Sequence, residues 1–207
     1  MDLVIFDLDG TLIDSKLDLA HAVNATRTFM GRPPLEHDLV YSYVGNGAPV
    51  LIRRALPDAS EQDLERALTY FLEYYRDHML DFTTLYPGVK QTLETLDSSG
   101  VRLAVLTNKP VRISKAILEG LGVAPRFFQI FGGNSFGQKK PHPIGVETLM
   151  AEAGVQPAST LMVGDSAVDI QTARNAGIKA CGVTYGFQPE TLETNPPDYL
   201  INEMPDL

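Results

Sequence analysis

Short apolar runs separated by helical patterns are the feature of this sequence that most restricts its fold. The runs fall at 3–6, 102–107, 160–164 and 180–184, with shorter candidates at 129–131 and 199–201. A run that is apolar at successive positions is typical of a strand buried on both faces, as in a parallel sheet covered by helices. The sequence therefore predicts strands that belong to one buried sheet.

Helical patterns lie between these runs, at about 88–98, 112–121, 143–153 and 167–176. Strands that alternate with helices of this length build a parallel sheet with helices on both faces. We predict an α/β fold whose core is a doubly wound, Rossmann-like parallel sheet. This core would comprise residues 1–13 and 85–207.

The segment 14–84 interrupts the alternation and carries no convincing strand. Within 61–80 the apolar residues stand three or four apart, which is the spacing of one helix face. Ser60 occupies the position of an N-cap, and the acidic residues Glu61 and Asp63 suit the positive end of a helix. We therefore predict that residues 14–84 form an inserted helical cap domain.

Composition excludes several classes of partner. The 207 residues include 26 acidic and 17 basic side chains, a net charge of −9 that would repel nucleic acid. No apolar stretch approaches the length of a membrane span. The densest basic pairs are Arg53-Arg54, interpreted as a solvated helix face, and Lys139-Lys140. The single cysteine, Cys181, cannot form an internal disulfide, so a cytoplasmic protein is expected.

Polar residues follow the apolar runs at the edge of the sheet where ligands bind in open α/β folds. The first group is Asp7-Leu8-Asp9-Gly10. Carboxylates two residues apart at a strand end project to the same side. One of them can attack phosphorus, the other can protonate the leaving oxygen, and Gly10 lets the backbone approach a phosphate. A plain Asp-Gly turn remains an alternative.

Three further groups would complete a phosphate site. Thr107 and Asn108 precede a helix, where a hydroxyl and backbone N–H groups suit phosphate oxygens, although taken alone the pair is better explained as a simple helix N-cap. Lys140 could pair with a phosphate and the nucleophile, unless it is a solvated loop residue. Asp165 and Asp169 border the first turn of a helix and suit Mg²⁺, unless Asp165 only caps that helix.

Together these motifs resemble the haloacid dehalogenase-like superfamily, and within it the phosphoglycolate phosphatase-like group with a helical cap. The resemblance covers essentially the whole chain. It rests on the segments 4–12, 107–110, 140–143 and 163–166 with Asp169, and on Tyr43-Val44-Gly45-Asn46-Gly47 in the insert. It implies an active site between the core and the cap.

The resemblance also implies a role for each residue of these motifs. Asp7 would be the nucleophile and Asp9 the general acid and base. The phosphate would be held by Gly10, Thr107, Asn108 and Lys140. Mg²⁺ would be bound by Asp7, the Asp9 backbone carbonyl and Asp165, with Asp169 in support. Gly45, Asn46 and Gly47 would close over the substrate.

The expected protein is a Mg²⁺-dependent phosphatase that acts on a small phosphorylated metabolite through an aspartyl-phosphate intermediate. By resemblance the favoured substrate is 2-phosphoglycolate. A sugar phosphomutase, a pyrophosphatase and a non-catalytic binding module on the same scaffold are the alternatives. No nucleic acid or membrane partner is expected, and the chain would be a monomer or a homodimer.

Overall fold

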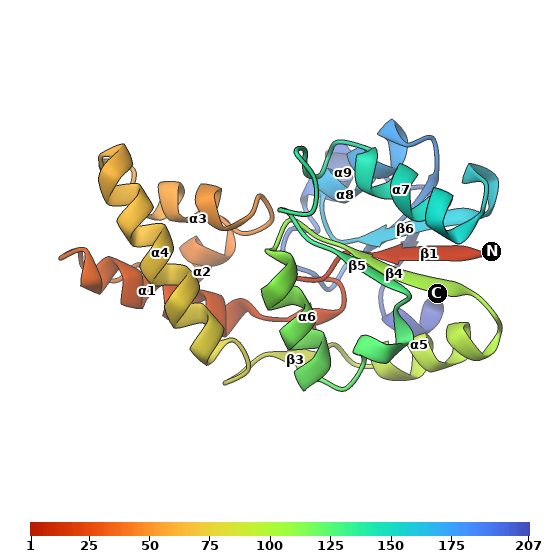
Figure 1. Ribbon diagram of the computed structural model, residues 1–207, viewed down its shortest axis with the longest axis horizontal. Coiled ribbons are helices and arrows are strands. Elements are labelled where there is room, and N and C mark those ends of the chain that lie inside the picture. The colour runs from red at the N-terminus through yellow and green to blue at the C-terminus, as the bar shows by residue number, and fades with distance from the viewer. The chain divides into compact units, whose positions relative to one another are not determined.

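The computed structural model describes all 207 residues and divides the chain into two compact units (Figure 1). Residues 1–14 and 85–207 form the first unit, which we name the core. Residues 15–84 form the second unit, which we name the insert.

The core is built on one six-stranded sheet with the order β5-β4-β1-β6-β7-β8, in which every pairing is parallel. The strands are β1 (Leu3–Phe6), β4 (Arg102–Leu106), β5 (Gln129–Phe131), β6 (Thr160–Gly164), β7 (Lys179–Val183) and β8 (Tyr199–Ile201). Each corresponds to an apolar run in the sequence. The predicted parallel sheet is confirmed.

Helices cover both faces of this sheet because successive side chains of a buried strand point to opposite sides. Leu3 and Ile5 of β1 join the hydrophobic cluster formed with α7 (Ile144–Ala153) and α8 (Ala167–Asn175). The helices α5 (Val89–Ser98) and α6 (Val111–Gly120) lie on the other face (Figure 1). The doubly wound, Rossmann-like core is therefore confirmed, and a short helix, α9 (Thr191–Thr194), precedes β8.

The insert is helical, as predicted. It contains α1 (Lys16–Phe29), α2 (His37–Tyr41), α3 (Ala48–Ala55) and α4 (Glu61–His78). Ser60 is the N-cap of α4, and its hydroxyl accepts a hydrogen bond of 3.2 Å from the backbone N–H of Asp63. No helix of the protein combines the length and the apolar character that crossing a bilayer requires.

One sequence expectation for the segment 14–84 needs correction, since it does contain strand residues. Two strands of two residues each, β2 (Ile13–Asp14) and β3 (Thr84–Leu85), pair where the chain leaves the core and where it returns. An alternation of period two cannot be recognised in two residues, so the sequence pattern gave no sign of them.

A buried carboxylate joins the two ends of the insert. Asp18, near the start of α1, accepts hydrogen bonds from the backbone N–H of Phe82 at 3.1 Å and of Thr83 at 2.8 Å. The Thr83 hydroxyl donates a further bond of 2.7 Å to the same carboxylate. A buried carboxylate is stable only when such donors replace its hydration, so Asp18 and the segment 82–83 depend on each other.

We expect the substitution Asp18→Asn to lower the free energy of unfolding by about 2 to 3 kcal/mol, because hydrogen bonds to a charged acceptor are lost and an amide N–H₂ group faces backbone donors. Urea unfolding followed by circular dichroism measures this change. Asp2→Asn is the control, since Asp2 is exposed and its side chain makes no hydrogen bond. Equal stability of the two variants would contradict the assignment.

Candidate active site

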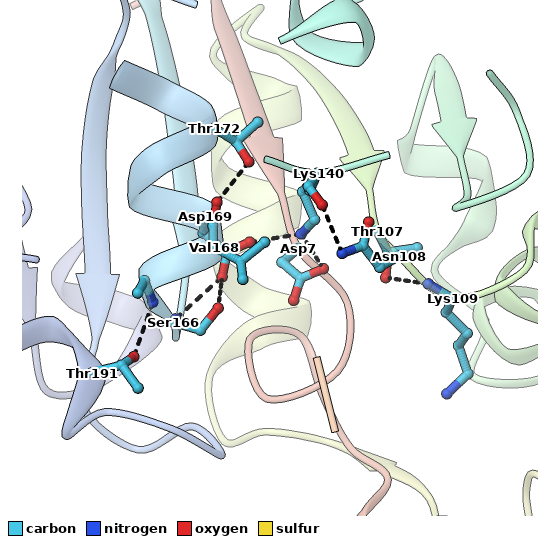
Figure 2. A network of polar contacts seen from close by, with 11 residues as sticks. Asp7, Thr107, Asn108, Lys109, Lys140, Ser166, Val168, Asp169, Thr172 and Thr191 are labelled. Carbon is cyan, nitrogen blue, oxygen red and sulfur yellow. Dashed lines mark hydrogen bonds and ion pairs between the residues drawn. The ribbon is translucent and has the colours of Figure 1, made fainter. Parts of the chain in front are cut away.

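The polar groups singled out in the sequence meet at the carboxyl ends of the central strands. Asp7 directly follows β1, Thr107 follows β4 and Asp165 follows β6. Since β1 pairs with both β4 and β6, these three positions are neighbours in space. Lys140 reaches the same place from the loop between β5 and α7 (Figure 2).

Lys140 connects two carboxylates that are far apart in the sequence. Its Nζ lies 2.7 Å from Asp7 Oδ1 and 2.6 Å from Asp169 Oδ1, and its side chain is 3% exposed. Figure 2 shows the ammonium group between the two acids. The Asn108 side-chain amide donates a 3.2 Å bond to the Lys140 backbone carbonyl and so fixes the loop that carries the lysine. Lys140 is therefore a buried ion-pair residue and not a solvated loop lysine.

Asp169 is held by a capping box at the start of α8. Ser166 is the N-cap, and its backbone N–H and hydroxyl donate to Asp169 Oδ2 at 3.2 and 2.8 Å. The cap of this helix is therefore Ser166 and not Asp165. Gly164 is required here because a Cβ at this position would lie 2.2 Å from the Asp169 Cβ.

Asp165 is fixed by the loop after β7, whose Phe187 backbone N–H donates to Asp165 Oδ2 at 2.6 Å. The turn after β1 also approaches this carboxylate. A Cβ on Gly10 would lie 2.2 Å from Asp165 Oδ2, and the φ of Gly10 is +83°. The structure thus gives Gly10 a steric reason of its own, because only glycine tolerates both the contact and the dihedral angle.

Asp7, Asp165 and Asp169 form a compact acidic cluster, with one oxygen of each lying within 4.8 Å of the others. Asp7 Oδ2 and Asp165 Oδ1 receive no hydrogen bond from the protein, whereas both oxygens of Asp169 are engaged by Lys140 and Ser166. Hard oxygen donors of this kind fit a divalent cation such as Mg²⁺. The arrangement favours direct ligation by Asp7 and Asp165 and a supporting position for Asp169.

The electrostatics of the cluster follow from its burial. Desolvation raises the pKa of Asp7 to about 6 in spite of the nearby Lys140, and Asp169 adds to the rise. Desolvation also raises the pKa of Asp165 well above its ordinary value, with further contributions from Asp169 and Asp7. Burial would lower the pKa of Lys140, but its two carboxylate partners outweigh this effect and raise it. Lys140 pairs with two of the three acids and leaves Asp165 without a paired cation, so the cluster favours a further cation.

Lys109 lies beside these acids, although in the sequence it stands out only as part of the segment 107–110. Its Nζ lies 2.7 Å from Asp9 Oδ1, and the two side chains are 5% and 13% exposed. The Lys109 backbone N–H donates to the Thr107 hydroxyl at 3.2 Å, and the N-cap of α6 is Pro110, so Thr107 does not cap that helix. No local pattern joins Lys109 to a carboxylate 100 positions away, which is why only the fold reveals the pair.

The predicted substrate-closing residues Gly45, Asn46 and Gly47 lie in the insert, in the loop between α2 and α3. Gly45 and Gly47 adopt positive φ angles of 108° and 86°. The Asn46 side-chain oxygen accepts a 3.0 Å hydrogen bond from Arg54 on α3. The loop is thus anchored to the helix that follows it.

Comparison with known proteins identifies relatives over nearly the whole chain. Residues 4–183 match the family described as haloacid dehalogenase-like hydrolase. A phosphoglycolate phosphatase of Pseudomonas putida KT2440 is 41% identical over 98% of this chain and 76% of its own length. A phosphoglycolate phosphatase of Vibrio vulnificus YJ016 is 40% identical, over 99% of this chain and 93% of its own.

A solved structure also matches this chain over its whole length. The crystal structure of a predicted phosphoglycolate phosphatase from Haemophilus somnus 129PT superposes with a TM-score of 0.95 at 35% identity. The match covers 100% of this chain and 96% of that one. Because the likeness includes the insert as well as the core, it extends to the arrangement of elements in each.

The raised pKa of Asp7 predicts a pH dependence of stability. In metal-free protein the folded state binds the Asp7 proton more tightly than the unfolded chain, whose value is 3.8, so stability falls as pH rises from about 4 through about 6. A shift of about two units corresponds to about 3 kcal/mol. Urea unfolding in EDTA at about pH 4 and about pH 6 measures this change. Between these two values the free energy of unfolding should fall more for wild type than for Asp7→Asn. Identical losses in the two proteins would refute the assignment.

Proposed function

This chain belongs to the haloacid dehalogenase-like hydrolase family and is a phosphoric monoester hydrolase, and we propose that its reaction is the Mg²⁺-dependent hydrolysis of 2-phosphoglycolate to glycolate and phosphate. The observation that carries the proposal is the buried ion pair of Asp7 and Lys140 beside Asp165 and Asp169. A carboxylate held in this way can accept a phosphoryl group at a fixed position.

In the first step a carboxylate oxygen of Asp7 attacks phosphorus, the bond from phosphorus to the ester oxygen breaks, and an aspartyl phosphate forms. Asp9 donates a proton to the departing glycolate oxygen. In the second step Asp9 takes a proton from water, which attacks the phosphorus and releases inorganic phosphate and the Asp7 carboxylate. Lys140 keeps Asp7 oriented at 2.7 Å throughout.

The phosphate oxygens would be bound by the Lys140 ammonium, the Thr107 hydroxyl, the Asn108 side chain and the backbone beside Gly10. Asp7, Asp165 and the Asp9 backbone carbonyl would hold Mg²⁺, with Asp169 in support. When bound, the cation supplies positive charge that reduces the repulsion between an anionic nucleophile and an anionic phosphate. The acidic cluster and its raised pKa values support this assignment.

The choice of 2-phosphoglycolate rests on the names of relatives about 40% identical to this chain. A sugar phosphomutase and a pyrophosphatase share the proposed chemistry, but no observation on the site favours either. Closure of Gly45, Asn46 and Gly47 over the substrate, a cytoplasmic location and a monomeric or homodimeric state remain predictions.

Replacing the nucleophile tests the proposed reaction. With Mg²⁺ present, wild type should release phosphate from 2-phosphoglycolate, and Asp7→Asn should lower kcat by about 10³-fold or more because a carboxamide cannot form the acyl phosphate. Asp206→Asn, an exposed substitution, is the control. Removal of the cation with EDTA should also abolish turnover. Activity retained by Asp7→Asn would refute the nucleophile, and activity only on pyrophosphate or on sugar phosphates would refute the substrate.

Lys109 predicts a second and different effect. Lys109→Gln should lower kcat by about 10- to 100-fold and leave KM nearly unchanged, because Asp9 loses the cation that orients it for proton transfer. Lys109→Arg should restore most of kcat, since it restores the charge. Lys115→Gln is the control, because Lys115 is exposed on α6. An unchanged kcat in Lys109→Gln, or no rescue by Lys109→Arg, would show that Lys109 does not orient Asp9.

A further inference from the structure

A pocket of about 220 Å³ lies within the insert and is lined by three arginines, Arg27, Arg32 and Arg54. Its remaining wall includes Tyr43 and the segment 55–59 after α3. All lining residues belong to the insert, and none of them is among the residues assigned to the phosphatase reaction. The sequence shows no basic patch because Arg54 is more than 20 positions away from Arg27 and Arg32, which lie at the end of α1 and just after it.

Two of the three guanidinium groups are fixed by uncharged acceptors. Arg27 donates from Nε to the Pro33 carbonyl at 2.6 Å and from Nη1 to the Ala55 carbonyl. Arg54 donates to the Tyr43 carbonyl at 2.9 Å and to the Asn46 side-chain oxygen at 3.0 Å. Carbonyl and amide oxygens orient a guanidinium group but do not neutralise it, so the positive charge of the pocket is kept.

The charge of this pocket is unbalanced. None of the three arginines forms an ion pair, and neither does Asp58, the one acidic residue of the wall. The neighbouring Arg53 differs, since it pairs with Glu61 at 2.7 Å. Burial lowers the pKa of Arg27, and the charge of Arg32 lowers it further. In a chain with a net charge of −9, three arginines have been brought together here with only one acidic residue in the wall, and that residue pairs with none of them.

We propose that this pocket binds a small multivalent oxyanion, recognised through a phosphate or carboxylate group by Arg27, Arg32 and Arg54. Arginine presents several N–H donors in a plane that match the oxygens of either group. The volume is below the roughly 300 Å³ at which pockets for drug-sized ligands begin, so the ligand is an inorganic ion or a small metabolite. The proposal goes beyond the phosphatase reaction and does not depend on it.

Occupancy of the pocket has a local readout, because Arg54 also holds Tyr43 and Asn46 of the loop between α2 and α3. A ligand on Arg54 changes the surroundings of that loop. Backbone amide and arginine Nε–H signals of the insert will therefore report binding in ¹⁵N NMR spectra of the whole protein. The amides of Thr107 and Lys140 report separately on phosphate at the proposed active site.

The test is a titration of wild type with inorganic phosphate and, in a second arm, with citrate, each against chloride at matched ionic strength. We expect saturable shifts at Arg27, Arg32, Arg54 and the loop. Saturation by phosphate alone identifies a phosphate ligand, and saturation by citrate alone identifies a carboxylate. Shifts at Thr107 and Lys140 without shifts in the insert would overturn this proposal and leave the phosphatase proposal intact.

Arg32→Gln is the decisive variant, because Arg32 is exposed and its side chain supports no other part of the insert. It should weaken binding in the pocket by about tenfold, the loss expected for one charge-assisted hydrogen bond. Arg53→Gln, with the same charge change one residue from Arg54, should alter binding by less than about twofold. Equal weakening by both variants, or shifts that chloride reproduces, would mean nonspecific attraction and overturn the proposal.

Discussion

The ammonium group of Lys140 is the interaction on which the arrangement of the acidic cluster depends. It is buried between Asp7 and Asp169, and these acids belong to opposite ends of the chain. Buried carboxylates without a cation would either take up protons or move apart. The lysine keeps the turn after β1 and the start of α8 together before any ligand arrives. One lysine cannot balance three carboxylates, and Asp165 has no cationic side chain of its own, so the cluster keeps an excess of negative charge. The same excess would favour the binding of a divalent cation.

Charge is distributed differently in the two units. In the core, four acids gather at the strand ends with two lysines, Lys109 and Lys140, which suits a metal ion and a phosphoryl group. In the insert, three arginines gather around a pocket without a paired acid. Both clusters are partly unbalanced, and an unbalanced cluster that persists in a folded protein indicates a ligand of opposite charge. The overall charge of −9 conceals this division, because a sum over the chain carries no information about position.

Much of the fold and of the polar cluster could be predicted from the sequence. Buried strands can be recognised in the sequence because every residue of a run such as Leu3–Phe6 is apolar. Parallel pairing of these strands then places Asp7 and Asp165 at the same edge of the sheet. What could not be predicted depends on pairing between distant positions. The Lys109–Asp9 ion pair, the hydrogen bonds of Asp18 to segment 82–83 and the arginine pocket have no periodic pattern. The strands β2 and β3, of two residues each, are too short to show one.

The contact between Gly10 and Asp165 has a consequence for how this edge of the sheet can change. The turn after β1 lies so close to the Asp165 carboxylate that even a methyl group on Gly10 would clash with it. Gly186, in the loop after β7, is equally close, since a Cβ there would lie 2.6 Å from both Asp165 Oδ2 and the Gly10 carbonyl oxygen. The loops after β1, β6 and β7 therefore pack tightly, with the backbone at Gly10 and Gly186 against the Asp165 side chain. A side chain at either glycine would have to displace Asp165, so a related chain without this chemistry would still need glycine at both positions to keep the packing.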